Sequence, residues 1–173
     1  MNYPIRLTVC ALLLSISNLS AATLYASLGS TNPTPPYATW ATAATNIQDA
    51  VDAAAAGDEV VVTNGVYPGG LGVNGPLAVR SVNGPRFTVI DGGYAGINGV
   101  TPGVGNQCAS LANGGSLSGF TLTNGVAPSG GGVWCSTSAF LTNCVIAGNA
   151  AGSWSGEDPD YGPLWGWIFI LQL

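Results

Sequence analysis

The residues of this 173-residue chain that could perform acid–base or metal chemistry are few and far apart. Between residues 58 and 151 the acidic side chains are Asp58, Glu59 and Asp91. A calcium site needs several oxygen ligands that converge on one point, whereas Asp58 and Glu59 are neighbours and would face opposite sides of a strand. Asp91 precedes a Gly-Gly pair, where aspartate commonly bonds its own backbone. We therefore expect Asp91 to shape a turn, and we predict no catalytic, cofactor-binding or metal-binding residue.

An enzymatic alternative depends on Arg80 and Arg86, the two arginines outside the amino-terminal segment. If Arg80 lay beside Asp91 on one outward face, the pair would resemble the base and acid partner of a polysaccharide lyase. Such an arginine more commonly forms a surface ion pair worth less than about 1 kcal/mol. The sequence therefore favours a protein that is not an enzyme and keeps the lyase as the alternative.

Hydrolytic chemistry finds little support in the residues present. Glycoside hydrolysis needs two carboxylates across a cleft, but Glu157, Asp158 and Asp160 lie in an irregular segment that we predict to be a solvated loop. The chain has no histidine, so neither a Ser-His nor a Cys-His nucleophile can be assembled. The glycines at 130–132 are followed by neither a lysine nor a helix pattern, which excludes a phosphate-binding loop.

The cysteines and three of the aromatic residues leave alternatives open. Without Cys10 three cysteines remain, and the sequence favours burial of all three as small apolar residues over a Cys135–Cys144 disulfide; zinc binding is not expected without histidine. Tyr67, Tyr94 and Trp134 would stack on sugar rings if they were exposed, but packing in the core or in turns is the more frequent use. The three cysteines are Cys108, Cys135 and Cys144.

Charge and composition exclude several partners. Charged residues make up only 6% of the chain, glycine is abundant, and lysine is absent. Beyond the amino-terminal segment, two arginines stand against eight acidic residues, a net charge of −6. Phosphate backbones are bound mainly by clustered lysine and arginine, so nucleic-acid binding is not expected. Attachment to anionic lipid is disfavoured for the same reason.

Residues 1–22 have the pattern of a secretory signal peptide. Arg6 gives a positive start, residues 7–14 form an apolar run, and Ser20-Ala21-Ala22 is a small-residue cleavage site. The apolar run is far shorter than the roughly 20 residues needed to span a bilayer. We predict cleavage after Ala22 and a mature chain, without a transmembrane span, that is secreted or held at the cell surface.

One helix is predicted after the Pro-rich lead segment at 31–36. Thr45 and Gln48 match a capping box, in which each side chain satisfies a free backbone N–H. An apolar face at helical spacing follows, and Gly57 is placed to end the helix. The residues of that face are Ile47, Ala50, Val51 and Ala54.

Short apolar strands separated by Gly and Asn follow from residue 58 to about 149. Runs at 60–62, 77–79 and 88–90 are typical of a crowded parallel sheet, and six Asn-Gly pairs offer sharp turns between them. Asn-Gly is also the strongest hairpin signal, so an antiparallel sandwich is the competing fold. An internal repeat with a constant offset in residue number favours a solenoid over the sandwich. In it Leu111, Leu117, Phe120 and Leu122 match Cys135, Leu141, Cys144 and Ile146.

Several segments in the first half of the chain carry a resemblance to a known family. They are the stretch 39–54, then Gly57-Asp58-Glu59-Val60-Val61-Val62 with Gly65-Val66-Tyr67, and the segments 79–85 and 89–92. They resemble the amino-terminal part of secreted bacterial right-handed β-helix proteins of the pectin-lyase-like fold. In that family a short helix caps the solenoid and a Gly-Asp strand begins the first coil. Gly130-Gly131-Gly132-Val133 and the segment 140–143 resemble the repeats of polymorphic outer-membrane adhesins, with Gly132 where alanine is usual.

The segment 152–173 departs from this pattern. The repeat stops at Gly152, and the chain ends in an apolar run at 167–171 that is too short to span a membrane. We expect a truncated or frame-shifted tail; the alternative is an aromatic cap of Trp154, Trp165 and Trp167 over the last coil, which would protect its edge.

Together these patterns predict an all-β protein, a right-handed parallel β-helix of about four coils with one amino-terminal capping helix. The predicted divisions are a signal peptide at 1–22, a lead segment and capping helix at 23–57, coils at 58–151 and an irregular tail at 152–173. The predicted function is a non-catalytic scaffold, adhesin-like or carbohydrate-contacting, with a polysaccharide or another cell-surface component as partner. The alternative is the amino-terminal fragment of a β-helix polysaccharide lyase or glycoside hydrolase.

Overall fold

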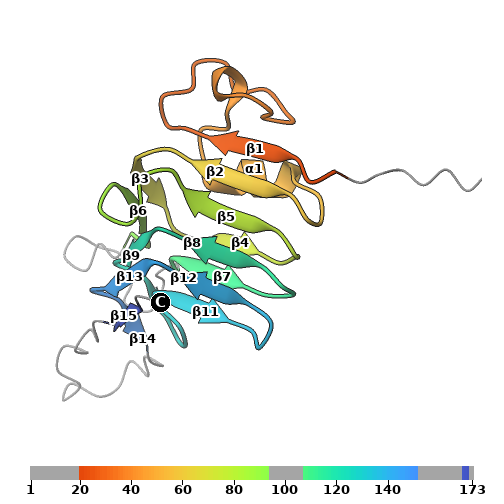
Figure 1. Cartoon of the computed structure of the whole chain (residues 1–173). Coiled ribbons are helices and arrows are strands. Elements are labelled where there is room, and N and C mark those ends of the chain that lie inside the picture. The colour runs from red at the N-terminus through yellow and green to blue at the C-terminus, as the bar shows by residue number, and fades with distance from the viewer. Residues whose placement is uncertain (1–19, 94–106, 152–168, 172–173) are drawn as a thin grey trace, which may run out of the picture.

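The computed structural model describes residues 20–93, 107–151 and 169–171, and Figure 1 shows them as a stack of strands that descends from β1 to β12. These residues form a 3-10 helix, η1 (Trp40–Thr42), an α-helix, α1 (Ile47–Ala53), and fifteen strands. In chain order the strands are β1 (Thr23–Ala26), β2 (Glu59–Val62), β3 (Gly65–Pro68), β4 (Leu71–Val73), β5 (Ala78–Ser81), β6 (Thr88–Asp91), β7 (Ala109–Leu111), β8 (Ser116–Ser118), β9 (Thr121–Thr123), β10 (Val126–Ala127), β11 (Val133–Cys135), β12 (Phe140–Thr142), β13 (Cys144–Ala147), β14 (Ala150–Ala151) and β15 (Phe169–Leu171).

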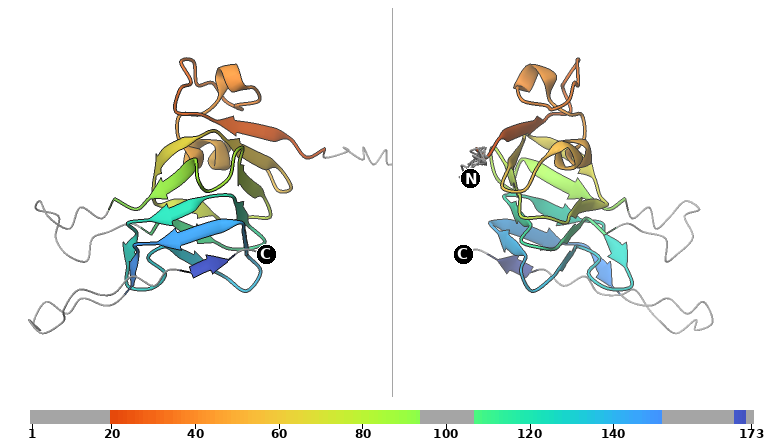
Figure 2. Two further views of the ribbon diagram at one scale, coloured as in Figure 1. Left: turned by 60° about the vertical axis from the view of Figure 1, so that its left-hand side comes forward. Right: turned by 90° about the vertical axis from the view of Figure 1, so that its right-hand side faces the viewer.

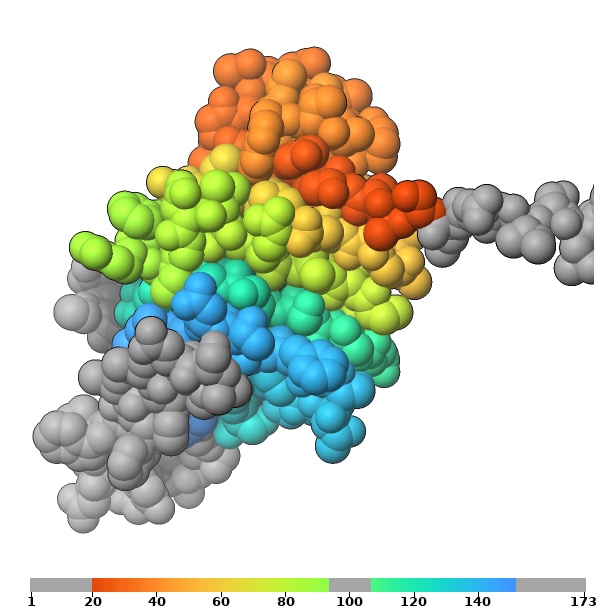
Figure 3. All heavy atoms as spheres, viewed as in Figure 1, coloured from red at the N-terminus to blue at the C-terminus, as the bar shows by residue number. Residues whose placement is uncertain are grey.

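The chain visits its sheets in a fixed order. Sheet 1 has the strand order β1-β2-β5-β8-β12, sheet 2 has β3-β6-β9-β13-β15, sheet 3 has β4-β7-β11, and sheet 4 pairs β10 with β14. Each passage from sheet 1 through sheet 2 toward sheet 3 is called a circuit here, and the next circuit lies directly beneath the last (Figure 2). The same succession runs down the surface in Figure 3. The structure is therefore mostly strands in parallel sheets, as the sequence predicts.

Parallel pairing places identical positions of successive circuits over one another. Leu117 pairs with Leu141, Leu122 with Ile146, and Leu111 with Cys135, all at the same sequence offset. The repeat is thus confirmed as a register. The competing antiparallel sandwich is wrong, because every strand pair among the described residues is parallel except β13 with β15.

The core consists of columns of inward side chains. In sheet 1, the column Leu24, Val60, Val79 and Leu117 is at most 3% exposed. Tyr67, Ile90 and Leu122 form the equivalent column of sheet 2 and are at most 1% exposed. Alternate residues of a strand face opposite sides, so the apolar residues of each strand point into the interior and the residues between them point to the surface.

The helix has a different cap from the predicted one. Asn46, not Thr45, is the N-cap residue: its side-chain oxygen accepts from Asp49 N at 2.7 Å, and its amide donates to the Asp49 carboxylate at 2.8 Å. Asparagine satisfies a free N–H group at a helix start at least as well as threonine does, so Asn46 caps the helix one residue after the predicted position. The predicted apolar face is confirmed for Ile47, Ala50 and Val51, which are buried, whereas Ala54 lies just beyond the helix and is only partly buried.

Gln48 takes no part in the helix cap, and its side chain binds the edge strand of sheet 3 instead. Its side chain donates to Gly72 O at 3.3 Å and accepts from Gly72 N at 2.8 Å, so its amide imitates the backbone of a neighbouring strand. The predicted stop at Gly57 is also displaced: α1 ends at Ala53 with Ala54 as C-cap, and Gly57, at φ +91°, turns the chain into β2.

The circuit that runs from β8 to β11 requires glycine where three chain segments meet. A Cβ on Gly125 would overlap the carbonyl oxygen of Gly131, and a Cβ on Gly131 would overlap that of Ala150. At Gly132 a Cβ would lie 2.7 Å from the amide nitrogen of Asn149. The space that a side chain at position 132 would need is therefore taken by Asn149.

Asn149 forms hydrogen bonds at the corner where these glycines have no side chains to pack. Its Oδ1 accepts from Gly125 N at 2.7 Å, and its Nδ2 donates to Leu122 O at 2.8 Å and to Ala147 O at 3.3 Å. These bonds tie Asn149 to backbone groups at the corner between two sheets. The side chain thus connects the last two circuits.

We expect Gly125→Ala to lower the free energy of unfolding by roughly 3 kcal/mol, because the new methyl group meets backbone that cannot move aside. Gly75→Ala is the control, since nothing lies within 4 Å of a Cβ there, and its effect should stay within about 0.5 kcal/mol. Urea unfolding followed by circular dichroism measures both. Equal stability of the two variants would contradict the close approach at Gly125.

We expect Asn149→Ala to cost about 2 kcal/mol, because it leaves the Gly125 N–H without its partner and removes the bond to the Leu122 carbonyl. The matched control is Asn83→Ala, whose exposed amide bonds only to Asn64 Oδ1 at 2.8 Å; its cost should be below about 0.5 kcal/mol. The same urea titration separates them. A loss at Asn83 as large as that at Asn149 would show that the corner bonds have no special role.

Candidate functional site

The neighbouring acids at the start of β2 have separate structural tasks. Asp58 is buried at 8% exposure, and its two oxygens accept from Ala22 N and Ala55 N, each at 2.7 Å. Glu59 faces outward and holds Arg80 by two bonds, at 2.7 Å from Nε and 3.2 Å from a terminal nitrogen. The pair is bidentate but half exposed, so it contributes less than about 1 kcal/mol. The hydrogen bond that Arg80 donates to Glu59 raises the pKa of Arg80 above its usual range.

Asp91 shapes a turn, as predicted. Its Oδ1 accepts from Gly93 N at 2.8 Å, and its Oδ2 accepts from the Asn124 amide at 3.2 Å. Asp91 lies in sheet 2 and Arg80 in sheet 1, and the ion pair of Arg80 is with Glu59. The structure therefore does not assemble the acid and base of the lyase alternative. Glu157, Asp158 and Asp160 lie outside the described residues.

Metal chemistry has no candidate in the part of the chain that the structure describes, where no three His, Cys, Asp or Glu side chains gather. Across the same residues no helix is long and apolar enough to cross a membrane. Tyr94, one of the aromatic candidates, lies outside the described residues.

Two of the three cysteines follow the prediction of burial. Cys108 is 0% exposed and Cys144 is 2% exposed, whereas Cys135 is exposed, so its predicted burial is wrong. Cys135 continues the column in which Leu111 is buried, but it belongs to the last strand of sheet 3 and has no described strand beyond it. All three thiols are free in the structure, which therefore does not contain the alternative Cys135–Cys144 disulfide.

The aromatic candidates divide between core and surface. Tyr67 is 1% exposed in the core; its hydroxyl bonds to Thr63 at 3.0 Å, and burial raises its pKa. Trp134 is 44% exposed on β11, with its side chain on the outer face of sheet 3. Of the sugar-stacking candidates that the structure describes, Trp134 alone is available to a ligand.

Trp134 stands in a column on that outer face. The register of sheet 3 places Gly72, Ser110 and Trp134 on successive strands. Neighbouring strands are about 4.8 Å apart, so the column extends roughly 10 Å from the Trp134 backbone to Gly72. The Asn74 amide lies over its far end, 3.4 Å from the position of a Cβ on Gly72. We call Gly72, Asn74, Ser110 and Trp134 the sheet-3 strip.

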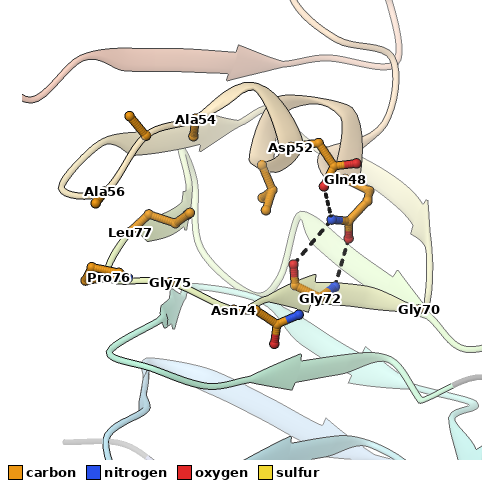
Figure 4. A pocket seen from close by; sticks show the side chains of 12 residues that line it. Gln48, Asp52, Ala54, Ala56, Gly70, Gly72, Asn74, Gly75, Pro76 and Leu77 are labelled. Carbon is orange, nitrogen blue, oxygen red and sulfur yellow. Dashed lines mark hydrogen bonds between the residues drawn. The ribbon is translucent and has the colours of Figure 1, made fainter.

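A shallow groove of about 490 Å³ adjoins the strip where α1 faces the loop between β4 and β5 (Figure 4). Gln48 and Asp52 line its helical side, and Gly72 and Asn74 line the opposite side. The Asp52 carboxylate accepts from the Gln48 amide at 2.7 Å, and that amide also bonds Gly72. The groove therefore offers amide and carboxylate oxygens in fixed positions beside apolar Leu77.

The comparisons with known proteins give no relative: no family model matches the chain, and neither a curated protein nor a solved structure matches it. The molecule is described by its class, an all-β protein of parallel sheets with one short α-helix among the described residues.

Sequence reasoning named Trp134 as a candidate but favoured its packing in the core or in a turn, which its exposure contradicts, and it missed the residues around it. Gly72, Asn74 and Ser110 are commonplace residue types, and only the register brings them to the same face as Trp134. The long sequence separation between Gly72 and Trp134 leaves no local signal. Gln48 stood out in the sequence, but its spacing from Thr45 indicated a helix cap and not a contact with Gly72.

The cysteines give a test of the burial pattern. We expect iodoacetamide at pH 8 to label Cys135 in the folded protein, and Cys108 only after unfolding, because burial raises the pKa of the Cys108 thiol to about 11. Peptide mass mapping locates the label. Because this pKa is higher in the fold than the unfolded value of about 8.5, stability should decline as pH rises from there through 11, and Cys108→Ala should reduce that decline. Labelling of native Cys108 as fast as Cys135 would contradict the structure.

Proposed function

We propose that this protein is an exported, non-catalytic, right-handed parallel β-helix that contacts carbohydrate, as an adhesin-like scaffold outside the cell or on its surface. The proposal of a β-helix is supported by parallel sheets visited in a fixed order with stacked registers. Connections between parallel strands are right-handed in about 98% of cases, which supports the handedness. The signal-peptide pattern of residues 1–22 supports export.

The observation that carries the carbohydrate proposal is the sheet-3 strip. An indole ring that is 44% exposed beside serine and glycine gives a flat apolar platform with little steric hindrance around it. Tyr and Trp are favoured at binding surfaces because they combine an apolar face with a polar edge. The strand spacing of about 4.8 Å is comparable to the length of one pyranose ring, so a saccharide chain can lie along the column.

Charge supports a neutral ligand at this surface. Residues 107–151, which include Ser110 and Trp134, contain no charged side chain. At the other end of the strip, Asn74 offers donor and acceptor atoms and Asp52 offers carboxylate oxygens, groups that suit sugar hydroxyls. A uronate chain would meet no cation on the strip. Neutral polysaccharide is therefore the preferred ligand class.

The alternative, an amino-terminal fragment of a β-helix lyase or hydrolase, is favoured by a different observation. Leu117 and Leu122 are 0% exposed, but their counterparts one circuit later, Leu141 and Ile146, are only partly buried. A further circuit would bury them. In that case the active coils would belong to a longer protein, and this chain would provide their first layers.

We expect Trp134→Ala to weaken binding to a neutral polysaccharide about tenfold or more, which is about 1.4 kcal/mol or more, because the stacking platform is lost. Affinity gel electrophoresis of the mature chain against neutral and uronate polysaccharides measures the effect. The matched control is Trp40→Ala: Trp40 is also 44% exposed, but it lies in η1 against Tyr25, with ring centroids 4.3 Å apart. Its removal should leave binding unchanged.

Two outcomes would contradict the proposal. Equal binding by both tryptophan variants would remove the strip as the contact surface. Unsaturated product absorbing in the ultraviolet, released from a uronate polysaccharide only with calcium, would establish the lyase alternative instead.

A further inference from the structure

Asp58 is a buried carboxylate whose hydrogen-bond donors are neutral. It is 8% exposed, and its oxygens accept the backbone N–H groups of Ala22 and Ala55, each at 2.7 Å. Burial of a charge is costly unless it is paired and hydrogen-bonded. Asp58 has the hydrogen bonds, but no ion pair with a side chain among the described residues.

The nearby charges do not supply a partner. Glu59, the next residue, holds Arg80, and the described chain contains one further cation, Arg86, which is exposed before β6. No described side chain therefore supplies a positive charge to Asp58. The backbone nitrogen of Ala22 is already in place, and it would be cationic if Ala22 were the first residue.

We propose that the bond between Ala21 and Ala22 is the processing site of the exported chain, and that the new α-ammonium group of Ala22 forms an ion pair with Asp58. A leader peptidase adds water across this amide, so that Ala21 leaves with a carboxylate and Ala22 gains the ammonium. The inference rests on the export in the proposed function and is independent of carbohydrate binding.

The surroundings of the bond fit this assignment. Residues 20–23 are exposed and, up to Ala22, lie outside any helix or strand, so a peptidase can reach them. Ala22 O accepts from Glu59 N at 2.9 Å, which holds the new terminus against β2. Cleavage after Ala22, the junction predicted from the small-residue pattern, would remove both the nitrogen that bonds Asp58 and the carbonyl that bonds Glu59.

The ion pair has a defined pH dependence. An α-amino group has a pKa near 7.7–8.0 when unperturbed, and the carboxylate of Asp58 would raise it in the fold. The stabilisation is then complete below about pH 7.7 and is lost as pH rises through the raised value. The other charged groups at this site, Glu59 and Arg80, are paired with each other.

The first experiment is expression of the full precursor with export, followed by intact mass and amino-terminal sequencing. The expected mature chain begins at Ala22. A mature chain beginning at Thr23 would overturn this inference and leave export intact. An unprocessed precursor retained in the cell would overturn the export part of the proposed function.

The second experiment measures the ion pair in the processed chain. The sequence has no lysine, so mild acetylation of amines modifies the terminus alone. Acetylation at pH 7 should lower the folding equilibrium constant about fivefold, the difference between a charged and a neutral hydrogen bond. It should also abolish the loss of stability that the terminus causes as pH rises above neutrality.

Asp58→Asn should make the free and acetylated chains equally stable, whereas Asp52→Asn, at an exposed acid of α1, should keep their difference. If Asp58→Asn does not fold, the acetylation result still decides. Equal stability of the free and acetylated wild-type chains at pH 7 would overturn the ion pair.

Discussion

The parallel register imposes one constraint on every other feature of the molecule: an inward side chain lies directly over its counterpart in the preceding circuit. Leu117 rests beneath Val79 and above Leu141, and no side-chain rearrangement in one circuit is independent of the next. Interiors packed at crystal-like density have no room for a change of volume at a single level. The corner between circuits tightens the constraint further, because Gly125 and Gly131 approach with no space for a Cβ. Asn149 then holds the corner by hydrogen bonds where side-chain packing is impossible.

In a stack of circuits the middle circuits are buried and the two end circuits are exposed. Different elements cover the two ends. At the amino-terminal end, α1 packs beside β1, β2 and β4, and the Gln48 amide occupies the free backbone groups of Gly72. Free strand edges pair readily with other chains, and covering the edge is one of the ways proteins prevent it. At the other end, β15 covers the edge of β13, while β12 and β11 are the last strands of their sheets among the described residues. The exposure of Cys135 follows directly from this position.

The sequence predicted those features that the register repeats and missed those that depend on one contact. The repeat was visible because the segments that carry β8 to β10 and β12 to β14 have the same length, so every matched pair has one offset. The earlier circuits differ, since the connection from Val79 to its partner Leu117 is much longer than the one from Val60 to Val79. Unequal connections hide a repeat even when the strands stack.

Single contacts decided the features that were missed. The cap at Asn46 was missed because Thr45 with Gln48 fits the same helix start, and in the structure Gln48 bonds Gly72 instead. The column of Cys135 was predicted correctly, but sequence periodicity does not mark the last member of a column.

The outward residues of the strands are not constrained by the core: no core contact dictates the identity of Ser110 and Trp134. The later circuits, at residues 107–151, carry no charged side chain, so the proposed ligand would be bound there by shape, hydroxyl, amide and aromatic contacts. Each such contact is weak, and affinity then depends on many of them acting along one partner. A polysaccharide meets that requirement, because its own repeat can follow the regular spacing of the strands.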